Sequence, residues 1–99
     1  MYSIRTLPEF DAWLKGLADK TVQRRLVVRL RKAALGNLGD VKSVGHGVSE
    51  IREHFGAGWR MYFTTRDGQI VVLLGGGAKS SQVRDIAAAH RRAEHLSWE

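Results

Sequence analysis

Residues 48–74 read VSEIREHFGAGWRMYFTTRDGQIVVLL, and this stretch decides the fold. Its side chains alternate in character, most clearly at Trp59, Met61 and Phe63, and two turn sequences, Gly56-Ala57-Gly58 and Asp67-Gly68, divide it. A period of two is typical of β-strands, and short glycine-containing turns join antiparallel neighbours. We therefore expect an antiparallel meander with strands over residues 48–55, 59–65 and 69–74.

Two helices are expected before this meander. Thr6 and Glu9 have the spacing of a capping box with Pro8 in the first turn, so a helix should begin at Leu7. Its apolar face carries Leu7, Phe10, Trp13, Leu14 and Leu17. Asp19 is expected to cap a second helix over residues 20–35, which Gly36 ends. Residues 2–5 alternate briefly and fit a short strand.

The segments on either side of the meander have different patterns. Residues 36–47, GNLGDVKSVGHG, are glycine-rich without a helical period, and we expect an irregular loop. After the third strand, Gly75-Gly76-Gly77 should break the chain, and Ser80 or Ser81 should cap a last helix that runs to about Leu96. One side of this helix carries Val83, Ile86, Ala87, Ala89, Ala93 and Leu96.

Length and composition limit the classes of protein. A chain of 99 residues with 43% hydrophobic and 26% charged residues is typical of one globular domain, spanning residues 1–99. It has no cysteine, which excludes disulfides, thiolate metal sites and a cysteine nucleophile and suits a reducing cytoplasm. The longest aliphatic run is residues 70–74, and the N-terminus has no signal-peptide pattern. We expect a cytoplasmic protein without a membrane segment.

The net charge of +6 is concentrated in the second helix. Its basic residues are Lys20, Arg24, Arg25, Arg29, Arg31 and Lys32, with no acidic residue among them. On a helical wheel they lie opposite the apolar face. Because all six are cations, they cannot form salt bridges with one another. A solvated surface is one interpretation, but the mutual repulsion of these cations favours a polyanionic partner.

Alternation also separates the two faces of the meander. Ile51, Phe55, Trp59, Met61 and Phe63 share an apolar face that should pack on helices. The opposite, polar face should present Arg52, His54, Arg60 and Tyr62, with Lys79 just after the third strand. Arginines can bind and stabilise a phosphodiester under attack, and a lysine or histidine can move protons. The alternative is a solvated face whose arginines pair with Glu50 or Asp40.

Two other motifs are incomplete, so no metal and no cofactor is expected. The sequence GGGAKSS would need glycine at Leu73 and Ala78 to form a nucleotide-binding phosphate loop. His90 and His95 are five residues apart and do not share a helix face as paired zinc ligands would.

The motifs GNLGDVKSVGHGVSEIR, FGAGWRMYF and VVLLGGGAKSSQVRDI, taken in this order, resemble a known family. They are similar to the killer proteins of type II toxin–antitoxin modules, in the RelE/ParE superfamily and near its HigB-like branch. The resemblance covers nearly the whole chain. It implies an α+β fold in which a small antiparallel sheet of about four strands carries two N-terminal helices on one face, followed by a C-terminal helix.

The resemblance also implies an activity. RelE-like members cut messenger RNA without metal, commonly on the ribosome, when the ribose 2'-hydroxyl attacks the adjacent phosphate. It places Arg60 and Lys79 at phosphate-binding and proton-transfer positions, with Arg52 as the next candidate. His54 is a further catalytic candidate from the alternation alone, because it projects beside Arg52. The nucleic-acid-binding candidates are Lys20, Arg24, Arg25, Arg31, Lys32, Lys42 and Tyr62. A cognate antitoxin with a helix-turn-helix domain is implied as partner.

The sequence departs from the family pattern at one turn, and two alternative functions stay open. The GGDK turn of the family reads GGAK here, so the carboxylate is lost at Ala78 or its role passes to Asp85. A ParE-like inhibitor of DNA gyrase would share the fold without nuclease activity. An inactive toxin that only binds its antitoxin is the third possibility.

Overall fold

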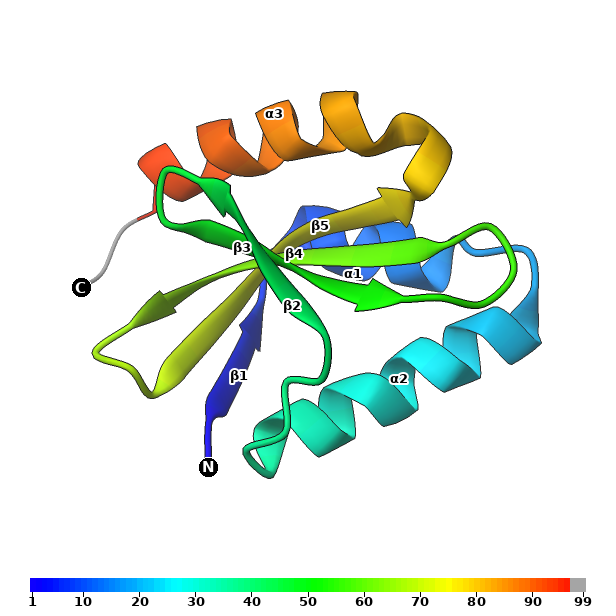
Figure 1. The fold of residues 1–99 in the computed structure, drawn as a ribbon, viewed down its shortest axis with the longest axis horizontal. Helices are drawn as coiled ribbons and strands as arrows, with labels where there is room; N and C mark the ends of the chain where they lie inside the picture. The colour runs from blue at the N-terminus through cyan, green and yellow to red at the C-terminus, as the bar shows by residue number, and fades with distance from the viewer. Residues whose placement is uncertain (97–99) are drawn as a thin grey trace.

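The computed structural model describes residues 1–96, which form one five-stranded sheet with three α-helices packed around it (Figure 1). In chain order the elements are β1 (Ser3–Thr6), α1 (Pro8–Lys15), α2 (Lys20–Ala34), β2 (Val41–Gly45), β3 (Val48–Glu53), β4 (Trp59–Arg66), β5 (Ile70–Ala78), a 3-10 turn (Lys79–Ser81) and α3 (Gln82–Glu94). Within these residues no helix is long and apolar enough to cross a bilayer.

The α+β class is confirmed, but the sheet is larger and more mixed than expected. Its strand order is β1-β5-β4-β3-β2, which makes five strands instead of about four. β2, β3, β4 and β5 pair antiparallel, whereas β1 runs parallel to β5. The two chain segments that form β1 and β5 are more than 60 residues apart, and no local pattern indicates such a pairing.

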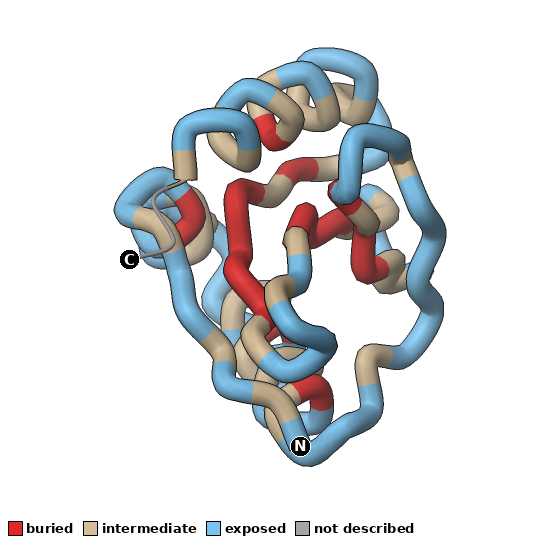
Figure 2. The backbone as a smooth tube through the Cα atoms, turned by 90° about the vertical axis from the view of Figure 1, so that its left-hand side faces the viewer, coloured by how far each residue is buried: buried red, intermediate tan, exposed pale blue. Residues whose placement is uncertain are grey.

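Helices cover both faces of the sheet (Figure 1). α1 and α2 enclose one apolar cluster of Phe10, Leu26, Ile51, Met61, Phe63, Val71 and Leu73. α3 encloses a second cluster of Val48, Tyr62, Val72, Leu74 and Ala89 on the other face. Figure 2 shows the buried segments between the helices, in the strands at the centre. The expectation of an open polar face is therefore wrong, because α3 must bury its own apolar side and does so there.

The two helix-start predictions had different outcomes. Asp19 caps α2 as expected, since its Oδ1 accepts hydrogen bonds from the backbone N–H groups of Thr21 at 2.9 Å and Val22 at 3.4 Å. The capping box before α1 is wrong. Thr6 is the last residue of β1 and pairs with β5, so the helix begins at Pro8 after Leu7 without a side-chain cap.

The glycine triplet does not end the third strand of the meander. β5 continues through Gly75, Gly76 and Gly77 to Ala78. A Cβ at Gly76 would lie 2.3 Å from the Trp13 ring of α1, and one at Gly77 would lie 1.9 Å from the Asp85 carboxylate of α3. These glycines are thus in the strand because helices approach its backbone closely from both faces.

The expected loop over residues 36–47 contains a strand. β2 pairs with β3 in a hairpin whose turn includes His46 at φ 54°. At the other end of the chain, Ser81 precedes α3 without capping its backbone, and its hydroxyl donates instead to Asp85 at 2.5 Å. Val83, expected on the apolar side of α3, is 87% exposed.

Candidate functional site

The four predicted catalytic residues, Arg52, His54, Arg60 and Lys79, lie at one end of the sheet, which we call the cationic end. Arg52 pairs with Arg60 across β3 and β4, and Arg60 pairs with Gly77 of β5, so their side chains share the α3 face. The backbone N–H of Lys79 donates to the carbonyl of Gly58 at 2.8 Å. A Cβ at Gly58 would lie 3.3 Å from Lys79 Cβ and 3.8 Å from Arg60 Nη1, so both residues flank this turn.

Arg60 is not on an open surface, contrary to expectation. It is 6% exposed, and its Nε lies 3.9 Å from Oε2 of Glu50, which is 1% exposed. Gln82 at the start of α3 donates to the same Glu50 oxygen at 2.8 Å. Burial by α3 thus converts Arg60 from a free cation into one partner of a buried ion pair, and removing it would leave Glu50 charged in the interior.

Tyr62 is also buried, which corrects its placement among exposed nucleic-acid contacts. The residue is fully covered, and within residues 1–96 its hydroxyl has no hydrogen-bond partner. Burial, together with Glu50 and Asp85, raises the pKa of this phenol above its ordinary value. Tyr62 therefore contributes to the second apolar cluster instead of to a polar surface.

Arg52 and His54 lie at the accessible side of the cationic end. Asp40, just before β2, binds both: its Oδ1 accepts from Arg52 Nη2 at 3.0 Å, and its Oδ2 lies 2.6 Å from His54 Nε2. The exposed fractions are 30% for Arg52 and 62% for His54. The Arg52 and His54 hydrogen bonds hold the pKa of the Asp40 carboxyl below its ordinary value. Pairing of the two arginines with Asp40 and Glu50, one of the alternatives from the sequence, is what the structure contains.

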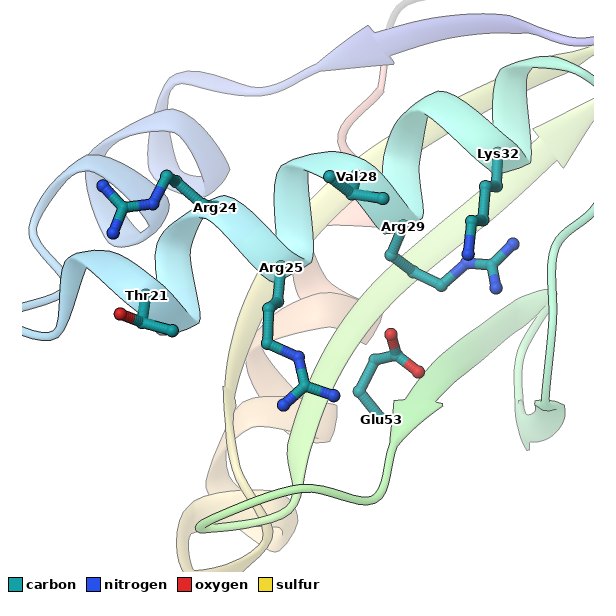
Figure 3. Close-up of a pocket in the computed structure, with 7 residues that line it drawn as sticks. All are labelled: Thr21, Arg24, Arg25, Val28, Arg29, Lys32 and Glu53. Carbon is teal, nitrogen blue, oxygen red and sulfur yellow. The ribbon is translucent and has the colours of Figure 1, made fainter.

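The basic face of α2 forms a separate groove on the other face of the sheet. We define it by its lining residues, Thr21, Arg24, Arg25, Val28, Arg29, Lys32 and Glu53, which enclose about 320 Å³. In Figure 3, Arg25, Arg29 and Lys32 extend from α2 toward Glu53 at the end of β3. Arg25 stacks on the Phe55 ring at 3.7 Å, and Arg29 donates to the carbonyl of Asn37. These two guanidinium groups are thus held in place before any ligand binds.

The remaining predicted nucleic-acid contacts are exposed. Lys20 and Arg31 are on α2, and Lys42 is on β2 opposite Glu50. Lys20 and Arg31 do not join the cationic end into one continuous strip, because α2 and the α3 face lie on opposite sides of the sheet. Among residues 1–96, no three histidine or acidic side chains gather where they could hold a metal ion.

Asp40 and Gln82 are site residues that the sequence did not identify as such. Both follow from tertiary structure: Asp40 depends on the unexpected strand β2, and Gln82 depends on α3 crossing the sheet. The motifs GDVK and KSSQ contain them, but the sequence indicated Asp40 only as a possible ion-pair partner of an arginine and gave no partner for Gln82.

Comparisons with known proteins give a consistent result. A family model for phage derived, Gp49-like proteins (DUF891) matches residues 12–94. An uncharacterized protein of Haemophilus influenzae is 39% identical over 93 residues, 94% of each chain. Among solved structures, a chain of the intact E. coli RelBE toxin–antitoxin complex has a TM-score of 0.65 at 17% identity, covering 79% of this chain and 96% of that one. A variant of the E. coli toxin RelE in the free state has a TM-score of 0.70 at 13% identity, with coverage of 96% and 98%. These similarities to solved structures establish the RelE-like fold.

Proposed function

Because the chain belongs to the phage derived, Gp49-like family and has the RelE-like fold, we propose that it is the toxin of a type II toxin–antitoxin module that cleaves messenger RNA. The observation that carries this proposal is the gathering of Arg52, His54, Arg60 and Lys79 at one end of the sheet. The HigB-like branch, the cytoplasm as location and the ribosome as the place of action belong to the same proposal, supported by the motif order and the basic charge.

The accessible groups at the cationic end suit cleavage by the neighbouring ribose. When the 2'-hydroxyl attacks phosphorus, the phosphorane gains negative charge, which the Arg52 guanidinium stabilises. Lys79 is exposed and donates a proton to the departing 5'-oxygen. Buried Arg60 does not contact the phosphate in this scheme. Arg60 lies beside Arg52 in the next strand. Its ion pair with Glu50, which also accepts a hydrogen bond from Gln82, connects it to α3.

The groove on α2 supports binding of the RNA beyond the cut. Arg24 and Lys32 line it, and among the described residues neither has an ion-pair partner. We expect Arg24→Ala with Lys32→Ala to weaken RNA binding for all sequences and to reduce the slope of log K against log salt by about 1.4, at about 0.7 per lost single-strand phosphate contact. Binding titrations at several salt concentrations measure this slope, with Lys15→Ala on α1 as a matched exposed cation. An unchanged slope contradicts the assignment of the groove to RNA.

A cognate antitoxin, with a helix-turn-helix domain, is the partner in this proposal. The related fold in the RelBE complex supports it, and the net charge of +6 suits an acidic segment that covers the basic surface.

Induction of the chain alone in a bacterial host tests the proposal. We expect growth arrest with cleaved transcripts, and recovery when the neighbouring gene product is co-expressed and binds the chain. Arg52→Ala with Lys79→Ala should remove the arrest, whereas Lys15→Ala should not. Arrest with intact transcripts and lost DNA supercoiling would identify a gyrase inhibitor instead, and a tolerated wild-type gene would identify an inactive toxin.

A further inference from the structure

Asp40 binds two side chains of the cationic end with its two oxygens. Oδ1 accepts from Arg52 at 3.0 Å, and Oδ2 lies 2.6 Å from His54 Nε2. Such an arrangement fixes the orientation of an imidazole and leaves its other nitrogen facing away from the carboxylate. His54 is 62% exposed, so its ring is accessible from solvent.

The fold holds this carboxylate firmly. The carbonyl of Asp40 accepts a hydrogen bond from the backbone N–H of Arg52 at 2.8 Å, which extends the β2–β3 ladder by one residue. On the other side, Gly39 adopts φ +73° and donates its N–H to the Asn37 side chain at 3.0 Å. Arg29 of α2 binds the Asn37 carbonyl. The loop that delivers Asp40 is therefore tied both to the sheet and to α2.

An acidic side chain here is unexpected for a site that only binds RNA. A carboxylate beside the phosphate repels the substrate and neutralises part of the Arg52 charge. The hydrogen bonds from Arg52 and His54 keep Asp40 ionised by lowering its pKa. Its presence at the accessible side of the cationic end therefore needs a purpose other than affinity.

Resting on the proposed RNA cleavage, we infer that His54 is the general base of the reaction and that Asp40 is the residue that positions it. Asp40 accepts the Nε2–H of the neutral imidazole, so Nδ1 takes the proton of the ribose 2'-hydroxyl. The 2'-oxygen forms a bond to phosphorus, and the bond from phosphorus to the 5'-oxygen breaks. The products are a 2',3'-cyclic phosphate and a 5'-hydroxyl, whose proton comes from Lys79 and is replaced from water.

Asp40→Asn separates a positioning role from a merely electrostatic one. Loss of a surface carboxylate alone would improve RNA binding and leave kcat unchanged. If Asp40 positions His54, kcat should fall by roughly 10- to 100-fold while KM is unchanged or lower, and Asp40→Glu should recover part of the rate. Asp67→Asn, the same charge change at an 81% exposed position in the β4–β5 turn, serves as control.

His54→Ala completes the experiment, which uses the full chain and a defined messenger RNA on translating ribosomes. We expect kcat to fall by about 10²- to 10⁴-fold and to recover in part on adding imidazole. If the wild type cleaves RNA and Asp40→Asn has an unchanged kcat, or His54→Ala cleaves at the wild-type rate, the inference is wrong and the nuclease function stands. If the wild type cleaves no RNA, both are wrong.

Discussion

Gly76→Ala is expected to destabilise the fold by about 3 kcal/mol, which for a domain of this size lowers Tm by roughly 12 to 24 °C. A Cβ at this position lies 2.3 to 2.5 Å from three atoms of the Trp13 ring. That ring packs between Phe10 and Trp59, with centroid distances of 5.7 and 6.3 Å, so it cannot move aside without disturbing the first apolar cluster. Thermal denaturation followed by circular dichroism measures the change.

Gly75→Ala is the matched control on the same strand. Its Cβ would clash only with the terminal Nη1 of Arg92, at 2.5 Å, and this flexible side chain can shift at the cost of its hydrogen bond to the Leu74 carbonyl, which is smaller than the cost of moving a packed ring. The double variant Trp13→Ala with Gly76→Ala should lose less stability than the sum of its single variants, because the clash is gone. Equal Tm values for Gly75→Ala and Gly76→Ala, or strict additivity, would show that Trp13 does not require the glycine.

The contact between Gly76 and Trp13 also explains why the end of β5 could not be predicted from the local sequence. Three glycines in a row have low strand propensity, and on local grounds they indicate a break. Their reason for being in β5 lies more than 60 residues away, in the tryptophan of α1, and in Asp85 of the following helix. Likewise β2 is an edge strand inside the glycine-rich segment 36–47, and its pairing with β3 outweighs the weak local propensity of that segment. Local signals had mixed outcomes: the Asp19 cap of α2 is correct, whereas the Thr6 capping box is wrong because Thr6 pairs with β5 as part of β1.

The sequence indicated which cations of β3 and β4 share a face, but not how far each of them is exposed. Alternation correctly placed Arg52, Arg60 and Tyr62 on one face of β3 and β4, and the register confirms that Arg52 and Arg60 are neighbours. The sequence also indicated an apolar side on the last helix. An apolar helix side must pack against another surface, and because α1 and α2 cover the apolar face of the sheet, α3 packs on the polar face. Covering it buried Arg60 and Tyr62 and left Arg52, His54 and Lys79 accessible.

This difference in burial decides which variants can test the chemistry. Arg60→Ala leaves Glu50 as an unpaired charge in the interior, so lost activity would report on folding as much as on catalysis. Arg52 is partly exposed and its partner Asp40 is solvated, so Arg52→Ala removes a cation without burying a new charge. We expect Arg52→Ala to reduce cleavage by about 10²- to 10³-fold, the usual effect of losing one group that stabilises transition-state charge.

The most direct measurement maps the ends of a defined messenger RNA after incubation with the purified chain and translating ribosomes, beside the same RNA carrying one 2'-deoxyribose at the cut position. We predict a 2',3'-cyclic phosphate and a 5'-hydroxyl at the cut, no cut at the 2'-deoxy position, the stated loss for Arg52→Ala and unchanged cleavage by Lys15→Ala. An intact message with the wild-type chain, or equal cleavage by wild type and Arg52→Ala, would contradict the assignment of RNA cleavage to the cationic end.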